Sequence, residues 1–543
     1  MKISRIIVSI AFSMLPLCTF AAGKLDNIIP LPKSITAGEG EIAFASCNVK
    51  FCNVNSEVQA IAEEFSEKLS KISGVKASSK SPTLLFKYDK AQPAEGYCLI
   101  IESQKVEVTA SDYNGFIYGI TTIKQLLPEA IFGNEIVKDA DWSLKCCKIE
   151  DVPFFAYRGA HLDVCRHIFS KEEIKKYLDA MAMCKMNRFH WHLTEDQGWR
   201  IQIDSYPLLT KVGAWRKGSQ IGFDRTTCDG VKYGGYYTKD DIREIVSYAK
   251  KLGIEVIPEV DLPGHMVAAL AAYPELGCTG GPYEVRTCWG ISKEVLCPAK
   301  ESTFKFLEAV LAEVVELFPY EMFHIGGDEC PKDAWKLCPA CQKKIAELGY
   351  VDNEQGTKED YLQSYVMSRV QNFLATKGKK VIGWDEILKG NPAPGTTIMH
   401  WRRNKDCTEA SRRGFNTILV PASHLYIDHR QLADMNSCPP SINRNHPEKA
   451  VPFSKLYSFE PYKGLDDNAK RFILGVQCNL WTEYIATPEH LEYMAMPRMF
   501  ATSEIQWQNP SSEKDINRVM MAVTEHGYKM LDACGFVYCT KME

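Results

Sequence analysis

The residues of this chain that point most directly to chemistry are two adjacent carboxylates, Asp328 and Glu329, at the end of an apolar run at 322–326. If that run is a buried strand, both side chains project where it leaves the core, and neighbouring side chains point to opposite sides. An ordinary retaining glycosidase holds two carboxyl groups about 5 Å apart across the bond it cleaves. Adjacent residues do not readily reach that geometry, so one of the two carboxylates is expected to have a different role.

The elements that must position this pair follow a regular order. From residue 158 onward, apolar runs alternate with amphipathic helical patterns, as in parallel β/α units. Ser170 and Glu173 form a capping-box pattern ahead of one helix, and other helical patterns begin near Thr238 and Ser302 or include Tyr361. The strand candidates are 159–163, 188–193, 254–260, 322–326, 380–384, 397–401, 417–421 and 474–481.

Eight strand-and-helix units predict an α/β fold, a (β/α)8 TIM barrel whose active-site residues gather at the carboxyl ends of the strands. A doubly wound open sheet is the alternative, but no glycine-rich phosphate loop follows any run. The preceding segment, 24–152, mixes short β-rich runs with two helical patterns and contains no cluster of catalytic residue types. It predicts a small non-catalytic α+β domain, followed by a catalytic barrel domain at 153–543.

The composition is typical of a soluble globular enzyme. The chain has 543 residues, enough for two domains, with 45% hydrophobic and 24% charged residues. A net charge of -4 gives no electrostatic reason to expect a nucleic-acid partner. No run beyond the first residues is apolar over the ~20 residues that a membrane helix needs, so no transmembrane segment is expected in the mature chain.

The first 21 residues have the pattern of a secretory signal peptide. Lys2 and Arg5 precede an apolar run at 6–17, and the small residues Ala21 and Ala22 follow. Cleavage after Ala21 predicts an exported protein that is periplasmic, secreted or surface-associated. A lipid anchor at Cys18 is the alternative, although the residue before it is not the small one usually found at such sites.

Cysteine is abundant, with 20 residues in the full chain. Loss of Cys18 with the leader leaves an odd number, so at least one thiol is unpaired within a monomer. Cys338 and Cys341, with Cys330 upstream, suggest zinc, but no second cysteine or histidine pair stands at zinc-finger spacing. Disulfides or inert thiols are therefore the expected state of these residues.

Residues whose side chains can catalyse a reaction or bind a ligand follow every strand candidate, and most of them are carboxylates or aromatics. Aromatic faces stack on the apolar faces of sugars, while carboxylates and arginine bind hydroxyls. The candidate site residues are Arg166, Glu195, His265, Asp328, Glu329, Trp384, Trp401, Tyr426, Asp428, Trp481 and Glu483. Together they predict a carbohydrate site at the barrel mouth.

Two other interpretations compete with a sugar-cleaving enzyme. A divalent metal could be bound by a set of histidines and one carboxylate, but these residues lack the helical HExxH spacing and would leave the aromatics unexplained. The residues in question are His190, His192, Asp261, His265 and His324. A glycan-binding protein without catalysis is the second alternative, against which the Asp328-Glu329 pair argues.

The ordered motifs resemble the β-N-acetylhexosaminidases of glycoside hydrolase family 20 from about residue 24 to the C-terminus. The most specific matches are 162–167, 189–200, 258–265, 324–329 and 481–483. In that family the 2-acetamido carbonyl of the substrate attacks the anomeric carbon and forms an oxazolinium intermediate, with net retention. The resemblance implies that the nucleophile belongs to the substrate and that no metal or other cofactor takes part.

The resemblance also implies residue roles. Glu329 would be the general acid and then the base, Asp328 would hold the acetamido N–H, and Tyr426 would donate to the acetamido oxygen. Trp384, Trp401 and Trp481 would wall the pocket, and Arg166, Asp428 and Glu483 would bind sugar hydroxyls. His265 would support the catalytic acid together with Glu195, which stands where the family most often has aspartate.

The activity implied is exo-acting hydrolysis of terminal β-linked N-acetylglucosamine, with N-acetylgalactosamine as a second substrate, from oligosaccharides or glycoconjugates. A lacto-N-biosidase, which releases a disaccharide by the same chemistry, is the nearest alternative. The oligomeric state does not follow from the sequence.

Overall fold

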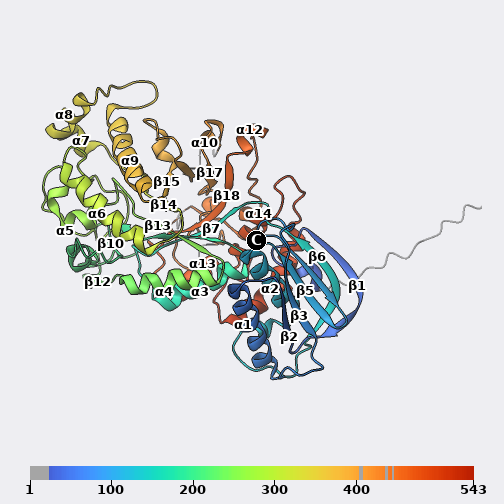
Figure 1. Ribbon diagram of the computed structural model, residues 1–543. Coiled ribbons are helices and arrows are strands. Elements are labelled where there is room, and N and C mark those ends of the chain that lie inside the picture. Colours follow the sequence, from blue (N-terminus) through green and yellow to red (C-terminus); the bar gives the residue numbers. More distant parts are fainter. Residues whose placement is uncertain (1–23, 403–407, 435–437, 443–445, 543) are drawn as a thin grey trace, which may run out of the picture.

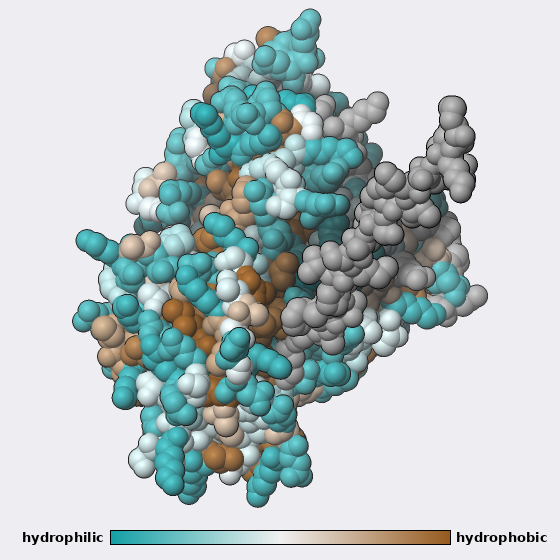
Figure 2. Space-filling model, turned by 90° about the vertical axis from the view of Figure 1, so that its right-hand side faces the viewer, coloured by the Kyte–Doolittle hydropathy of each residue, from teal (hydrophilic) through white to brown (hydrophobic). Residues whose placement is uncertain are grey.

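The computed structural model of the protein describes residues 24–402, 408–434, 438–442 and 446–542. The predicted signal peptide at 1–21 and the alternative lipid site at Cys18 lie outside these residues. Figure 1 shows a sheet domain, in blue, packed beside a larger barrel domain. Within the described part of the chain, no helix combines the length and apolar character needed to cross a bilayer. The face drawn in Figure 2 is mostly hydrophilic, with small groups of hydrophobic residues near its middle.

The N-terminal domain is a six-stranded mixed sheet in the order β1-β6-β4-β5-β3-β2. Its strands are β1 (Ser34–Ala43), β2 (Asn48–Cys52), β3 (Thr83–Tyr88), β4 (Tyr97–Glu102), β5 (Lys105–Ala110) and β6 (Ser143–Asp151). Helices α1 (Ser56–Ser73) and α2 (Tyr113–Leu126) pack on the sheet. The side chains of Asn55 and Asp112 cap the first turns of the two helices.

The barrel domain is a closed barrel of eight parallel strands, so the predicted fold class is confirmed. Every strand candidate is a barrel strand, with bounds shifted by at most a few residues. The strands are β7 (Tyr157–Asp163), β8 (Arg188–His192), β13 (Glu255–Glu259), β14 (Met322–His324), β15 (Lys380–Trp384), β16 (Thr397–His400), β17 (Thr417–Leu419) and β18 (Ile473–Leu480).

Long helices follow the first four strands of the barrel. They are α3 (Lys171–Met183), α4 (Lys239–Lys251), α6 (Glu301–Leu317) and α9 (Lys358–Thr376). The predicted capping box of Ser170 and Glu173 is present, and Thr238 forms a second one with Asp241. The next units are shorter than predicted, since β15 is followed by the four-residue η5 (Asp385–Leu388) and β16 by α10 (Glu409–Arg412).

The remaining elements belong to the loops and the C-terminal region. The loops contain β9 (Thr194–Glu195), β10 (Gly198–Trp199), β11 (Trp215–Arg216), β12 (Tyr233–Gly234), α5 (Val267–Ala272), α7 (Asp333–Leu337), α8 (Pro339–Glu347), α11 (Phe453–Tyr457) and α12 (Asp467–Lys470). After β18 come α13 (Pro488–Ala495), α14 (Arg498–Trp507), α15 (Ile516–Ala522) and α16 (Tyr528–Cys534). Helix α14 packs on β18 and β7.

A buried ion pair joins the two domains. Arg158, on β7, donates to both carboxylate oxygens of Glu95 at 2.8 and 3.0 Å. Burial alone would raise the pKa of Glu95, but the charge of Arg158 and its hydrogen bonds outweigh burial and lower that pKa to about 2. Asn187 donates to the same carboxylate. The N-terminal domain is therefore fixed to the base of the barrel through a fully satisfied carboxylate.

We expect Glu95→Gln to lower the free energy of unfolding at pH 7 by about 3 kcal/mol, because Arg158 would stay buried without its counter-charge. The carboxylate has a depressed pKa, so its stabilisation is present above the ordinary value of 4.5 and is lost as pH falls toward 2. The difference between variant and wild type should therefore shrink at pH 3. Urea unfolding at both pH values measures this difference in unfolding free energy. Glu284→Gln, at an exposed ion pair, is the control.

Candidate active site

The loops at the carboxyl ends of the barrel strands enclose a pocket of about 330 Å³. Its lining contains all the predicted site residues except Trp384. The lining residues are Arg166, Glu195, His265, Asp328, Glu329, Trp401, Ala422, Tyr426, Asp428, His429, Ile442, Lys449, Trp481 and Glu483. Segments more than 300 residues apart in the sequence thus meet at one mouth of the barrel.

The backbone after β14 turns sharply to present Asp328 and Glu329. Gly326 and Gly327 have φ values of 64° and 101°. A Cβ on Gly326 would lie 1.6 Å from Oδ1 of Asp261, so only glycine fits there. Glu329 itself has φ 40°, a conformation that costs energy for a residue with a side chain. The two glycines and this strained residue hold the carboxylate pair at the pocket.

Asp328 lies beside a second carboxylate, Asp261, which follows β13. One oxygen of each and a nitrogen of His265 lie within 4.8 Å of one another. Burial raises the pKa of Asp328, and the Asp261 carboxylate raises it further. Burial also raises the pKa of Asp261. Two like charges at this separation are costly, so each carboxylate makes the other harder to ionise.

His265 connects the pair to Glu195. Its Nδ1 lies 2.7 Å from Oε1 of Glu195, and its Nε2 lies 3.8 Å from an oxygen of Asp328 and 3.8 Å from an oxygen of Glu329. Burial opposes a charge on the imidazole, but the carboxylates of Glu195 and Asp328 outweigh it and raise the pKa of His265. His265 has φ 53°, so strain is concentrated at this residue too.

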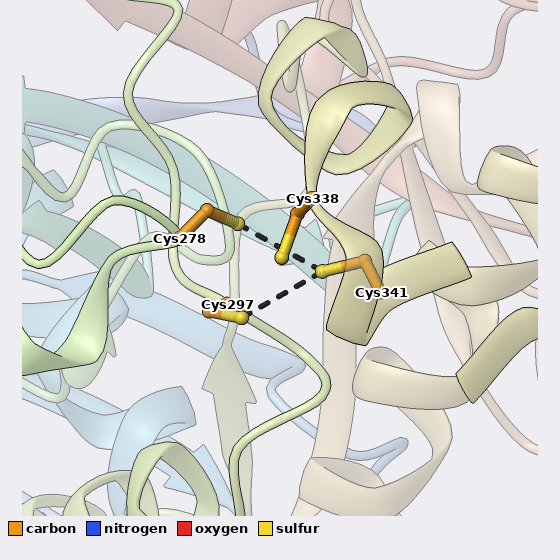
Figure 3. A group of neighbouring side chains, drawn as sticks. All are labelled: Cys278, Cys297, Cys338 and Cys341. Carbon is orange, nitrogen blue, oxygen red and sulfur yellow. Dashed lines mark hydrogen bonds between the residues drawn. The ribbon is translucent and has the colours of Figure 1, made fainter. Parts of the chain in front are cut away.

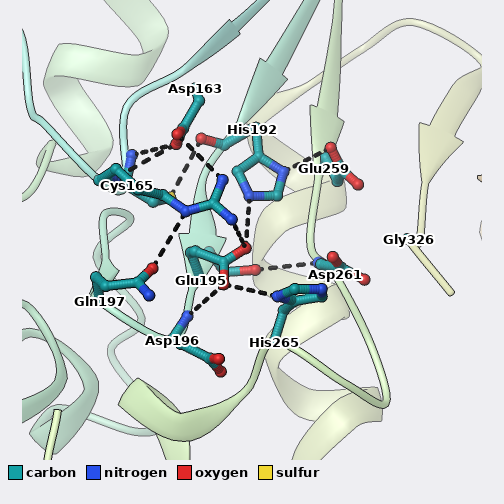
Figure 4. A network of polar contacts seen from close by, with 12 residues as sticks. Asp163, Cys165, His192, Glu195, Asp196, Gln197, Glu259, Asp261, His265 and Gly326 are labelled. Carbon is teal, nitrogen blue, oxygen red and sulfur yellow. Dashed lines mark hydrogen bonds and ion pairs between the residues drawn. The ribbon is translucent and has the colours of Figure 1, made fainter. Parts of the chain in front are cut away.

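The longer side chain of Glu195 reaches His265, whereas the adjacent Asp196 does not take this position. Asp196 accepts instead from the backbone N–H of Val267 and pairs with Arg286. Glu195 therefore occupies the predicted place next to His265, as Figure 4 shows.

Arg166 is held rigidly in a set of acceptors. Its guanidinium pairs with Asp163 at 3.2 Å and with Glu195 at 3.2 Å, and its Nε donates to Gln197 at 3.1 Å. It also lies over the ring of Trp481, 5.2 Å from the centroid. A guanidinium fixed in this way keeps a defined orientation toward a ligand in the pocket.

Aromatic rings form one wall of the pocket. The rings of Trp401 and Tyr426 are nearly parallel, with centroids 6.0 Å apart, and Trp481 lies 6.4 Å from Tyr426. Burial and the carboxylate of Asp428 raise the pKa of the Tyr426 hydroxyl, which therefore keeps its proton for donation. The Nε1 of Trp401 donates to Glu386 at 3.0 Å, which fixes the indole.

The resemblance implies that Trp384 is part of the pocket wall, but its side chain lies behind that wall, deeper in the barrel. It is 1% exposed, and its Nε1 donates to Glu259 at 2.8 Å. Its ring centroid is 6.0 Å from that of Trp481, which does line the pocket. Trp384 therefore packs behind the aromatic wall.

The barrel interior below the pocket contains a polar network around Glu259. This carboxylate lies 3.0 Å from His190, 2.7 Å from His192 and 3.0 Å from His324. Burial lowers the pKa of His190 to about 4, whereas at His192 the Glu259 charge outweighs burial and raises the pKa to about 10. One protonated imidazole thus balances the buried carboxylate.

The residues considered as metal ligands divide between two places. His190, His192 and His324 surround Glu259, while Asp261 and His265 lie beside Asp328. These five residues therefore do not surround one common metal position.

Asp428 and Glu483 provide the remaining polar groups of the pocket. Both carboxylate oxygens of Asp428 are buried and have no hydrogen-bond partner within the described residues. Burial raises the pKa of Asp428 and of Glu483. An unpartnered buried carboxyl group that faces a pocket is costly unless a ligand supplies the missing hydrogen bonds.

Several residues of this site were not assigned to it from the sequence. Asp163 and Glu259 stand at strand ends without a proposed role, and Asp261, also at a strand end, was considered only as a metal ligand. His429, Ile442 and Lys449 lie on the long connection between β17 and β18, where no sequence pattern identifies them as site residues.

The fold is a TIM barrel, and carboxylates, an anchored arginine and an aromatic wall surround its small pocket. Together these features define a class of carbohydrate-active enzyme. Residues 155–510 match the family described as "Glycosyl hydrolase family 20, catalytic domain", and residues 26–152 match "Glycosyl hydrolase family 20, domain 2". The chain belongs to glycosyl hydrolase family 20.

Relatives that are named as beta-hexosaminidases support this assignment. The chain is 40% identical to a beta-hexosaminidase of Porphyromonas gingivalis over 90% of its own length and 61% of the relative's. It is 35% identical to a beta-hexosaminidase of Vibrio furnissii, over 75% of this chain and 64% of the relative. The chain thus matches less than two thirds of the length of either relative.

Solved structures agree in fold. An exo β-N-acetylglucosaminidase of Vibrio harveyi in complex with N-acetylglucosamine has a TM-score of 0.81 and 29% identity, covering 95% of this chain and 78% of its own. A β-N-acetylhexosaminidase of Streptomyces coelicolor also has a TM-score of 0.81 and 29% identity, covering 95% of this chain and 98% of its own.

Proposed function

We propose that this protein is an exo-acting β-N-acetylhexosaminidase that removes terminal β-linked N-acetylglucosamine, and also N-acetylgalactosamine, from glycans. The observation that carries the proposal is the arrangement of Asp328 and Glu329. Both carboxylates lie 3.8 Å from the same nitrogen of His265, so they reach the pocket from one side. They are therefore poorly placed to act as nucleophile and acid on opposite sides of a glycosidic bond.

In the proposed mechanism the nucleophile is the 2-acetamido oxygen of the substrate. Glu329, whose side chain is 35% exposed, protonates the leaving oxygen and then activates water for the second step. Asp328 accepts the acetamido N–H and stabilises the positive charge of the oxazolinium ion, while the Tyr426 hydroxyl donates to the acetamido oxygen. Because the intermediate forms on one face and water attacks from the other, the product retains the β configuration.

The other pocket residues bind the sugar. Trp401 and Trp481 contact the acetamido methyl and the apolar sugar face, with Trp384 supporting them from behind. Arg166, Asp428 and Glu483 bind ring hydroxyls, and Glu195 with His265 positions the carboxylate pair. A volume of about 330 Å³ is at the lower end of the range of about 300 to 1,000 Å³ for ligand pockets, which favours one terminal sugar.

The deciding experiment compares nitrophenyl β-glycosides of N-acetylglucosamine, N-acetylgalactosamine and glucose. The glucoside lacks the internal nucleophile, so its kcat/KM should be lower by at least about 10³-fold, as expected when an intramolecular reaction of high effective molarity is lost. Comparable turnover of the glucoside would contradict substrate assistance. Release of disaccharides alone from a longer oligosaccharide would identify a lacto-N-biosidase, and binding without turnover would identify a glycan-binding protein. Proton NMR of the first product tests retention.

Asp261→Asn is expected to move the acidic limb of the kcat/KM profile to lower pH. Asp328 must be ionised to accept the acetamido N–H, so activity falls as pH drops through its raised pKa. The Asp261 charge contributes to that rise, and asparagine removes it while keeping an acceptor for Gly327 N–H. A pH series from 3 to 8 measures the limb, with Asp333→Asn, in an exposed ion pair, as control. An unmoved limb would show that Asp261 does not tune Asp328.

We also propose that the enzyme is exported, since residues 1–21 have the signal-peptide pattern. N-terminal sequencing of the protein from its native host tests this, with Ala22 expected as the first residue. A lipid-modified Cys18 at the N-terminus would instead indicate a membrane-anchored form.

A further inference from the structure

Four cysteines converge outside the pocket, in the loops that follow β13 and β14. This four-cysteine cluster consists of Cys278, Cys297, Cys338 and Cys341, whose sulfur atoms all lie within 4.8 Å of one another. The Sγ of Cys341 is 3.6 Å from that of Cys297 and 3.8 Å from that of Cys278. Figure 3 shows the four side chains pointing toward a common centre.

The sulfur separations match a tetrahedral metal site. With Zn–S bonds of about 2.3 Å, the sulfurs of a tetrahedral site lie about 3.8 Å apart. A disulfide needs an S–S distance of about 2.05 Å. The separations of 3.6 and 3.8 Å therefore match edges of such a tetrahedron, and the other sulfur pairs lie within 4.8 Å.

The local backbone presents the sulfurs in the manner of a zinc knuckle. Cys338 is the residue before α8, and Cys341 lies in its first turn. Pro339 opens the helix between them, so both thiols project from the N-terminal end, where the helix dipole favours negative charge. Cysteines near a helix N-terminus ionise more easily, and a thiolate is the form that binds metal.

The second pair of ligands comes from the other loop. The backbone N–H of Ala299 donates to the sulfur of Cys297. Lys300 lies near Cys297, and its ammonium donates to the carbonyls of Glu275 and Gly277. A positive charge and a backbone donor thus stand beside this sulfur.

The cluster is enclosed by its own small apolar core. Cys297, Cys338 and Cys341 are buried, together with Val295, Trp335, Ile345 and Leu362. The indole N–H of Trp335 donates to the carbonyl of Leu296, which fixes one loop against the other. Four sulfurs with few other polar partners in such a core are what a structural metal site requires.

We propose that the four-cysteine cluster binds one structural zinc ion. Tetrahedral S4 coordination suits zinc, and its binding by four thiols releases four protons to give a site of net charge -2. The expectation from sequence that Cys338 and Cys341 form disulfides or inert thiols did not foresee the cluster, because Cys297 precedes Cys338 by 41 residues and Cys278 precedes Cys341 by 63. Cys330, the upstream candidate, is not part of the cluster.

Zinc at this position would tie together the two loops that begin with the pocket residues. His265 starts the loop after β13, and Asp328 and Glu329 start the loop after β14. The cluster lies further along both loops, and none of its four residues is among the pocket-lining residues. The ion would therefore position these loops without taking part in hydrolysis.

The test uses the full mature chain, purified under reducing conditions and incubated with zinc. We expect about one zinc per chain by inductively coupled plasma mass spectrometry and, by X-ray absorption, four sulfur neighbours at about 2.3 Å. Cys338→Ser/Cys341→Ser should bind at least tenfold less zinc and melt several degrees lower. The control Cys228→Ser/Cys288→Ser should match wild type in both, because its sulfurs lie outside the cluster.

If the double variant does not fold, the metal content and sulfur coordination of the wild type still decide the matter. Zinc far below one per chain after loading, or iron in its place, would overturn the proposal. Intact mass and alkylation of protein from its native host that show Cys278, Cys297, Cys338 and Cys341 in two disulfides would also overturn it. Preference for acetamido sugars over glucosides should persist in chelator-treated protein, which separates this site from catalysis.

Discussion

Glu329→Gln is expected to lower kcat/KM for an unactivated N-acetylglucosamine disaccharide by about 10³-fold, or about 4 kcal/mol of transition-state stabilisation. The sugar leaving group is a poor one and needs a proton as the bond breaks, and an amide cannot supply it. A dinitrophenyl glycoside leaves without that proton, so its first step should be slowed far less. The contrast between the two substrates is the signature of a lost general acid.

Single-turnover kinetics on both substrates measure this contrast. Glu301→Gln is the matched control and should leave both rates unchanged, because Glu301 lies at the start of α6 in an exposed ion pair with Arg369. An equal loss on both substrates would mean that Glu329 binds the substrate and does not protonate the leaving group. An unchanged rate on the disaccharide would remove Glu329 from catalysis.

Asp328→Asn is the second large effect, with an expected loss of about 10²- to 10³-fold in kcat. The asparagine side chain has the same shape but no charge, so it cannot stabilise the positive charge that forms on the acetamido group. That charge forms whichever group leaves, so the loss should be similar for the disaccharide and for the dinitrophenyl glycoside. This pattern distinguishes Asp328 from Glu329.

The same pair of substrates decides the second prediction. A loss confined to the disaccharide would assign acid catalysis to Asp328 and reverse the proposed roles. A rise in KM without a fall in kcat would mean that Asp328 contributes equally to binding in the ground state and the transition state. The circular dichroism spectrum of Asp328→Asn should match that of the wild type, because removing the Asp328 charge relieves its repulsion from Asp261.

Much of the fold followed from local patterns. The barrel strands are short apolar runs, and the helices after the first four strands begin at side chains such as Ser170 and Thr238 that satisfy free backbone N–H groups. These signals act between residues that are neighbours in sequence. Their order then predicts a closed barrel, because parallel strands joined by helices have few other ways to bury both faces of a sheet.

Local patterns failed where distant segments meet. Trp384 stands at a strand end like Trp401 and Trp481, yet it packs behind them against Glu259. The short helical elements after β15 and β16 were also not predicted, because no local sequence signal distinguishes a long loop from a barrel helix.

The sequence alone determined the class of site: Asp328 and Glu329 follow a strand, glycines precede them, and aromatics stand at other strand ends. Only the tertiary structure decided which charges meet. The proximity of Asp261 to Asp328 and the convergence of four cysteines depend on the closure of the barrel. Burial in that closed fold removes water from these groups, so their charges act on one another in a way that no spacing along the chain reveals.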